Sequence, residues 1–311
     1  MGIIRGGDAE YDDNTPTPEE KTKKMAEAIS AALQDDPATL KLTGKYLGAD
    51  EALILSRSER LKAVRTLDLS DNQIPDEGLV ALFQSENLAG VTSLNLGINF
   101  ITGQGVEGIA RLENPAMTHL QSLTLSDNRV TDPAGAALAL SSHFQELERL
   151  DLGWNEIGNE TASALGRTET LPKLKQLELE RGYIDTLGVR GLIAGSVTER
   201  LVELNLSANK LNDEAIGLLA GCDRWHSLRV LRISQNQFGD AGAKALGDST
   251  ALSGLTHLYM GRNAFGAEGA QAVYETKTLT SLKTLVLKEG VETTPGLVNY
   301  SRPELLRPED P

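Results

Sequence analysis

The sequence repeats itself at a nearly constant spacing, and this repetition limits the fold more than any other feature. Eight segments share the frame Leu-x-Leu-x-x-Asn or a close variant of it, and they begin at Leu67, Leu94, Leu123, Leu150, Leu177, Leu204, Leu231 and Leu258. Their first leucines are 27 residues apart, except for one step of 29 residues. Leu40-Lys-Leu42 and Leu285-Val-Leu287 are degenerate copies at the two ends. A period of about 20 to 50 residues is typical of solenoids, in which each unit packs on its neighbours.

Each repeat reads as a short strand, a turn and a helix. In Leu67-Asp-Leu-Ser-Asp-Asn72, side chains alternate, so Leu67 and Leu69 face the core while Asp68 faces outward. The chain then turns at Asn72, Ile74 returns to the core, and a helix is expected from about Pro75. Because strands stack about 4.8 Å apart and helices need about twice that spacing, the array must curve with its strands on the concave face.

This pattern resembles the leucine-rich-repeat family, in particular its long-repeat, ribonuclease-inhibitor-like class. The resemblance implies an α/β fold: a right-handed horseshoe-shaped solenoid with a parallel sheet on the concave face and helices on the convex face. It also implies that the frame asparagines are buried and hydrogen-bond to neighbouring turns as a ladder. These residues are Asn72, Asn99, Asn128, Asn155, Asn209, Asn236 and Asn263.

The repeats also contain departures from the frame. Gly182 and Gly290 replace the asparagine in two units, so we expect the ladder to be interrupted there, with a local irregularity near residue 182. The unit that is two residues longer contains Glu113-Asn-Pro-Ala-Met117, which predicts a loop at residues 113–118.

The ends of the chain differ in composition from the repeats. Thr17-Pro-Glu-Glu20 is a helix-start signal, and Met25, Ile29 and Leu33 lie on one apolar stripe behind it. We therefore predict that residues 16–39 form a capping helix and that residues 40–299 form a solenoid of about ten repeats. The polar, Gly- and Pro-containing segments 1–15 and 300–311 are expected to be disordered.

Composition limits the choice of partners. The formal net charge of −14 repels nucleic acid and anionic membrane surfaces, and the sequence has no compensating basic patch. Cys222 is the only cysteine, so an internal disulfide is impossible and a reducing compartment is favoured. Neither a signal-peptide-like stretch nor a long uncharged apolar run is present, and we predict a cytoplasmic protein.

Catalytic and cofactor motifs are nearly absent. Residues 103–108 match the Gly-x-Gly-x-x-Gly frame of nucleotide-binding loops. We assign these glycines to the turns of the repeat instead, because Gly78, Gly105, Gly188, Gly242 and Gly269 share one phase. The four histidines fall in different repeats, which argues against a metal site. We expect no enzyme activity, no cofactor, no metal and no small-molecule substrate.

The concave face is the predicted binding surface for a partner protein. Neighbouring strands place Asp151 beside Glu178, with Glu180 close by, as an acidic centre. Trp154 is the strongest single anchor. The predicted partner-binding residues are Asp151, Trp154, Glu178, Glu180, Arg181, Arg232, His257, Tyr259 and Arg262.

An alternative is that these side chains only form ion pairs and ring contacts with one another and bind no partner. Arg149 and Arg181 would then pair with the carboxylates, and Arg181 would stack on Trp154.

These features predict a non-enzymatic protein-binding scaffold. Two alternatives stay open. The phrase Leu67-Asp-Leu-Ser-Asp-Asn-Gln-Ile-Pro-Asp-Glu-Gly78 is similar to repeats of Ran GTPase-activating proteins, which implies a regulator of a small GTPase. No catalytic residue carries over from that resemblance, because the phrase belongs to the scaffold. The second alternative is a secreted bacterial effector.

Overall fold

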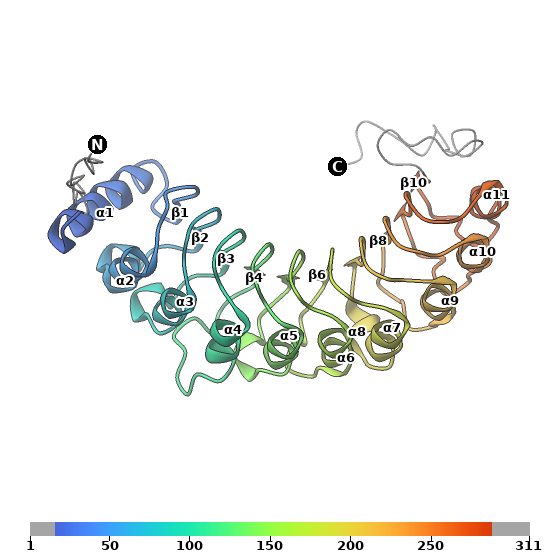
Figure 1. Cartoon of the computed structure of the whole chain (residues 1–311), viewed down its shortest axis with the longest axis horizontal. Coiled ribbons are helices and arrows are strands. Elements are labelled where there is room, and N and C mark those ends of the chain that lie inside the picture. The colour runs from blue at the N-terminus through green and yellow to red at the C-terminus, as the bar shows by residue number, and fades with distance from the viewer. Residues whose placement is uncertain (1–15, 288–311) are drawn as a thin grey trace, which may run out of the picture.

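The computed structural model describes residues 16–287, which form one continuous solenoid. Figure 1 shows a horseshoe with strands along its inner side and helices along its outer side. The predicted fold class is therefore confirmed. The segments 1–15 and 300–311, for which we expected disorder, lie outside the described residues, as do Gly290 and the predicted end of the solenoid at residue 299.

The concave face is one parallel sheet of ten strands in sequence order. Equivalent leucines pair across every strand boundary, as Leu67 does with Leu94. Each strand is three residues long, with the first leucine of the frame at its centre, as Leu67 is buried between the outward-facing Thr66 and Asp68. The strands are β1 (Thr39–Lys41), β2 (Thr66–Asp68), β3 (Ser93–Asn95), β4 (Ser122–Thr124), β5 (Arg149–Asp151), β6 (Gln176–Glu178), β7 (Glu203–Asn205), β8 (Val230–Arg232), β9 (His257–Tyr259) and β10 (Thr284–Val286).

The helices cover the outer face of the solenoid. They are α1 (Pro18–Ala32), α2 (Ala49–Arg57), α3 (Asp76–Phe83), α4 (Gly103–Ala110), α5 (Asp132–Ala139), α6 (Asn159–Arg167), α7 (Thr186–Ile193), α8 (Val197–Arg200), α9 (Asp213–Gly221), α10 (Asp240–Gly247) and α11 (Ala267–Tyr274). Three 3₁₀ turns, Glu59–Leu61, Glu86–Leu88 and Ser142–Phe144, lead from helices back towards strands. Leucines of both layers meet in one core, where Leu67, Leu69 and Leu79 are fully buried.

The N-terminal helix α1 packs on the first repeat. Its capping box is formed: Thr17 Oγ1 accepts from the Glu20 N–H, and the Glu20 carboxylate accepts from the Thr17 N–H. Met25 and Ile29 are buried in the same core as Leu40. Lys21 also reaches the second helix, with Nζ 2.7 Å from Asp50 Oδ2.

The frame asparagines connect successive turns. Asn72 is buried; its Nδ2 donates to the carbonyls of Leu42 and Leu69, and its Oδ1 accepts from the N–H groups of Lys45 and Leu47. Equivalent bonds recur at Asn99, Asn128, Asn155, Asn209, Asn236 and Asn263. These bonds satisfy backbone groups that would otherwise lie buried without partners.

The backbone stays regular where the ladder lacks a side chain. At Gly182 the asparagine bonds have no counterpart, yet β5, β6 and β7 pair in unbroken register. The expected irregularity near residue 182 is thus limited to the missing side chain, because the strand pairing on both sides holds the backbone. The predicted loop is present: residues 113–118 contain no helix or strand.

The residue before each frame asparagine has a left-handed backbone. Among residues 16–287 these are Asp71, Ile98, Asp127, Trp154, Ala208, Gln235 and Arg262, together with Arg181 before Gly182, with φ between 53° and 57°. Tyr46 also has φ 57°, but it follows the asparagine position, which Lys45 occupies in the first repeat. The conformation aims the next residue, the asparagine, into the core. It is costly for a β-branched residue such as Ile98, by about 1–2 kcal/mol.

Side chains of one helix cap the start of the next. Asp76 Oδ1 accepts from the Thr102 N–H at 2.7 Å, and Asp240 Oδ1 accepts from the Gly266 and Gly269 N–H groups at 2.7 and 2.8 Å. A Cβ at Gly105 would lie 2.3 Å from Asp76 Oδ1, so glycine makes room for the capping carboxylate. The glycines that share one phase therefore lie in the first turns of helices, and our assignment of them to turns between elements is wrong.

Candidate functional site

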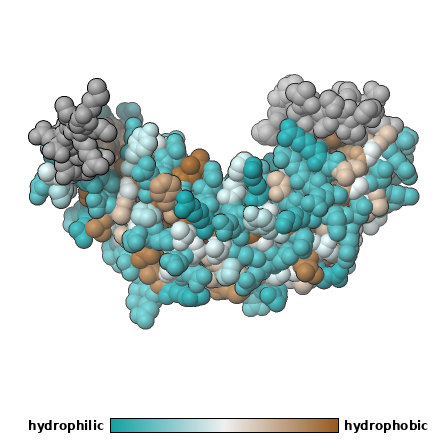
Figure 2. Space-filling model, in the orientation of Figure 1, coloured by the Kyte–Doolittle hydropathy of each residue, from teal (hydrophilic) through white to brown (hydrophobic). Residues whose placement is uncertain are grey.

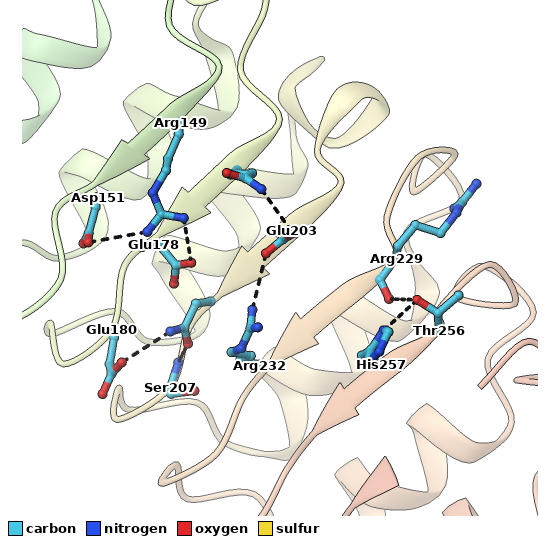
Figure 3. Close-up of polar contacts among 12 residues, drawn as sticks. Arg149, Asp151, Glu178, Glu180, Glu203, Ser207, Arg229, Arg232, Thr256 and His257 are labelled. Atoms are coloured by element: carbon cyan, nitrogen blue, oxygen red, sulfur yellow. Dashed lines mark hydrogen bonds and ion pairs between the residues drawn. The ribbon is translucent and has the colours of Figure 1, made fainter. Parts of the chain in front are cut away.

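The acidic centre lies in the middle of the concave sheet. Asp151 on β5 and Glu178 on β6 are register partners, and a single guanidinium, that of Arg149, lies between them. Its distances to the two carboxylates are 3.8 and 3.7 Å, so both ion pairs are loose (Figure 3). Glu180 joins them from the end of β6, where its carboxylate accepts from Asn205 Nδ2 at 3.3 Å. Two carboxylates therefore share one cation, and a third carboxylate lies close enough to act on the charge of Asp151.

Burial makes this acidic centre costly to ionise. Only 17% of the Asp151 side chain is exposed. Burial raises the pKa of Asp151 above its ordinary value, and the charges of Glu178 and Glu180 raise it further. The N–H of Gly153 and the charge of Arg149 oppose this rise without cancelling it. An added cation from outside would stabilise the ionised centre.

Trp154 and Arg181 lie beside the acidic centre at the turns that follow β5 and β6. The Arg181 guanidinium carbon is 4.0 Å from the centre of the Trp154 ring. This is the stacking predicted by the alternative in which these side chains contact only one another. The same alternative placed Arg181 against a carboxylate, but no ion pair of Arg181 is found within residues 16–287. Trp154 remains 44% exposed, so the stacked arginine covers only part of the indole.

The predicted residues Arg232, His257, Tyr259 and Arg262 lie towards the C-terminal end of the sheet and are called the C-terminal cluster here. Arg232 on β8 and Tyr259 on β9 are register partners, and the guanidinium carbon is 5.1 Å from the ring centre. His257 lies two residues before Tyr259 on the same strand, and its Nδ1 is 2.9 Å from Thr256 Oγ1. Within the described part of the chain, His257 Nε2 is buried without a hydrogen-bond partner. Arg262 is exposed in the turn after β9.

Glu203 on β7, which the sequence interpretation did not select, contacts side chains of the strands on both sides, β6 and β8. Its carboxylate accepts from Gln176 Nε2 at 3.0 Å on one side and lies 3.6 Å from Arg232 on the other (Figure 3). Asn205 was also missed as a contact of Glu180. Both residues stand in the outward-facing columns of the strands, so comparing charges across neighbouring repeats would have identified them.

Residues beyond the strands were missed for a different reason. Phe100 and Tyr183 directly follow the asparagine position in their repeats and are 49% and 56% exposed. The predicted binding residues stop at the position before the asparagine, although aromatic residues at the position after it were a usable signal. Figure 2 shows that the visible side of the molecule is mostly hydrophilic and interrupted by separate hydrophobic patches.

The described residues contain no other arrangement that suggests chemistry. Among residues 16–287, no group of three or more His, Cys, Asp or Glu side chains is placed to hold a metal ion. No helix in that range has both the length and the apolar character needed to cross a membrane. The site that remains is an open, charged and aromatic surface.

Comparisons with known proteins agree with this architecture. A family model described as "Leucine Rich repeat" matches residues 63–83, 116–139, 145–166, 226–247 and 254–273. No curated protein matches the sequence. Among solved structures, internalin C2 from Listeria monocytogenes is 24% identical, with 76% of this chain and 92% of that chain covered and a TM-score of 0.50.

Two further structures are similar to this chain. An internalin, InlF, from Listeria monocytogenes is 19% identical, with 92% of this chain and 96% of that chain covered and a TM-score of 0.42. A leucine-rich-repeat protein from Leptospira interrogans is 20% identical, with 87% of this chain and 72% of that chain covered and a TM-score of 0.44.

Five segments of the chain match the leucine-rich-repeat family model, and the chain has a leucine-rich-repeat solenoid fold like that of internalin C2. The ribonuclease-inhibitor-like class within the family stays a prediction.

Proposed function

We propose that this protein is a non-enzymatic interaction module whose concave face binds a partner protein. Leucine-rich-repeat domains generally bind proteins, and a stacked solenoid offers an extended, rigid surface. The observation that carries the proposal is the acidic centre, in which Asp151 and Glu178 share the cation Arg149. Glu180 adds a third carboxylate beside the half-exposed Trp154.

The chemistry of this centre favours a basic side chain on the partner. A lysine or arginine docked against the carboxylates would lower the cost of keeping Asp151 ionised, while Trp154 would contribute apolar contact area. Arg232 and Tyr259 would extend the contact towards the C-terminal end of the sheet, through Glu203.

Affinity capture with the full chain as bait tests the concave site. Wild type would be compared with Trp154→Ala, with the pair Asp151→Asn and Glu178→Gln, and with Leu140→Ala. Leu140 is a matched control, because it is 57% exposed at the end of the convex helix α5. Partners identified by mass spectrometry should be lost from both concave variants, retained by the control and weakened at high salt. Equal capture by all four baits would contradict the proposal.

The finer expectations on cellular role remain proposals. We place the protein in the cytoplasm as a scaffold, which fractionation of its own cells would test. Regulation of a small GTPase would require accelerated nucleotide hydrolysis on addition of the chain. A secreted effector would be found outside the producing cell.

A further inference from the structure

Exposed hydrophobic side chains collect along one edge of the solenoid, where strands turn towards helices. Of the eight large hydrophobic side chains exposed among residues 16–287, five lie between a strand and the next helix, and a sixth, Leu187, lies in the first turn of α7. We define the turn edge by Ile98, Phe100, Arg129, Trp154, Arg181, Tyr183, Leu187 and Lys210. Its apolar members are 44% to 66% exposed.

Each cation of the turn edge lies over an aromatic ring of the preceding repeat. Arg129 lies over Phe100, Arg181 over Trp154 and Lys210 over Tyr183, with distances of 5.7, 4.0 and 4.8 Å to the ring centres. Apolar and cationic groups therefore alternate at these positions, and the exposed carboxylates of Asp127 and Glu156 stand at equivalent turn positions of the same repeats. The arrangement spans five repeats, or at least about 19 Å at the spacing of neighbouring strands.

These three cations lack carboxylate partners. Within residues 16–287, no Asp or Glu oxygen lies within 4.0 Å of Arg129, Arg181 or Lys210. Some cations elsewhere on the surface are paired, as Arg190 is with Glu214 at 2.9 Å and Lys175 with Glu148 at 2.8 Å. In a chain with 44 acidic residues against 30 basic ones, the three cations of the turn edge are thus without a carboxylate partner among the described residues.

We propose that the turn edge is a second interaction surface, which binds a protein segment carrying apolar side chains interleaved with carboxylates. Apolar groups of the segment would pack on Phe100, Tyr183 and Leu187, and its carboxylates would pair with Arg129 and Lys210. Such pairs gain strength because the rings already shield one side of each cation from water. An extended segment of about six residues has the required length.

The turn edge differs from the concave site in both place and charge. The concave centre carries excess carboxylates and favours a basic partner group, whereas the turn edge carries unpaired cations. Trp154 lies where the two surfaces meet. A second copy of this chain is a poor occupant, because two molecules with a net charge of −14 repel each other.

A random peptide library displayed on phage and selected on the immobilised full chain tests the inference. Enriched peptides would be measured against three variants: an edge variant (Phe100→Ala and Tyr183→Ala), a charge variant (Arg129→Glu and Lys210→Glu) and a concave variant (Asp151→Asn and Glu178→Gln). We expect enriched peptides to combine Asp or Glu with large apolar residues. Their affinity should fall about tenfold or more on the edge and charge variants and stay unchanged on the concave variant.

The remaining outcomes would overturn the inference. These are failure to enrich any peptide, enrichment of basic peptides, or peptides whose affinity is unchanged on the edge and charge variants. Peptides lost only on the concave variant would support the proposed function while rejecting the turn edge. A wild-type dimer in light scattering that disappears in the edge variant would assign the edge to a second copy. The charge variant alters only exposed cations, so it remains informative if the edge variant unfolds.

Discussion

The carboxylate of Asp132 accepts a 2.7 Å hydrogen bond from the backbone N–H of Gly158, which lies one repeat further along the chain. The same carboxylate accepts from the N–H groups of Glu160 and Thr161 at 2.9 and 2.8 Å. A side chain in the first turn of α5 therefore caps the first turn of α6. This contact ties neighbouring helices together and satisfies N–H groups that have no partner inside their own helix.

Removing this cap should destabilise the solenoid. We expect Asp132→Ala to lower the free energy of unfolding by about 1–2 kcal/mol, the usual cost of losing a helix cap. Urea denaturation at neutral pH measures the change. Glu156→Ala is the control, because Glu156 is an exposed carboxylate in the following repeat and should have little effect. Similar losses for the two variants would show that the cap is not what stabilises this junction.

The cap should also depend on pH. Burial alone would raise the pKa of Asp132, but the hydrogen bonds from Thr161, Glu160 and Gly158 outweigh burial and hold that pKa below its ordinary value. Its stabilising effect is complete above the unfolded-state pKa of about 3.9 and disappears as the pH falls through the lower folded-state pKa. The stability gap between wild type and Asp132→Ala should therefore be constant near neutrality and shrink in acid. A gap that widens in acid would contradict this account.

Asp151 should behave in the opposite way. Burial first, and then Glu178 and Glu180, raise its pKa, so the ionised side chain destabilises the fold at neutral pH. Asp151→Asn keeps an oxygen that can accept from the Gly153 N–H, and we expect it to stabilise the protein by about 1 kcal/mol at pH 7. The gain should vanish at a pH below both pKa values, where Asp151 is protonated in both states. Thermal unfolding across pH tests this, with Asp127→Asn as an exposed control.

The fold was predictable because the repeat spacing determines which leucines pair. Once Leu67 and Leu94 occupy the same frame, parallel pairing and burial on one face follow from strand alternation. The left-handed backbone at Ile98 was not predictable from residue type, because β-branched residues avoid that conformation in isolation. The glycines of the helix starts were misassigned, since at Gly105, Gly242 and Gly269 the cause is a contact with a carboxylate 29 residues earlier in the chain.

For the candidate site, the sequence predicts only which residues are neighbours on adjacent strands. Register placed Asp151 beside Glu178 and Arg232 beside Tyr259. The remaining contacts depend on side-chain rotamers, which the sequence does not determine. Arg149 lies near two carboxylates, while Arg181 lies over the Trp154 ring. The turn edge was missed because Phe100 and Tyr183 follow the asparagine, where the alternation that defines the strand columns has ended.

Ile98 offers a test of backbone strain. It holds φ at 56° while its side chain is 51% exposed, so little packing compensates for the strain. Asparagine tolerates the left-handed region, and we expect Ile98→Asn to raise the free energy of unfolding by about 1 kcal/mol. Urea denaturation of Ile98→Asn and of Ile98→Val would separate strain from lost contacts, because valine is also β-branched and should bring no gain. Destabilisation by Ile98→Asn would mean that the exposed side chain contributes more packing than its exposure indicates.

Two helical glycines should respond in opposite directions to the same substitution. A Cβ at Gly166 in α6 would lie 2.2 Å from the carbonyl oxygen of Gly191, so the backbones of α6 and α7 would have to separate. A Cβ at Gly217 in α9 would meet nothing within 4 Å. We expect Gly166→Ala to cost about 1–3 kcal/mol through overpacking, and Gly217→Ala to stabilise by about 0.5–1 kcal/mol through its higher helix propensity.

The midpoints of urea denaturation for the two alanine variants measure this difference. Both variants gain the same helix propensity. A change in stability of opposite sign in the two variants therefore reports the close approach of α6 and α7 at Gly166. Stabilisation by both substitutions would mean that α6 and α7 can move apart without loss, and the close approach at Gly166 would then not be a requirement of the solenoid.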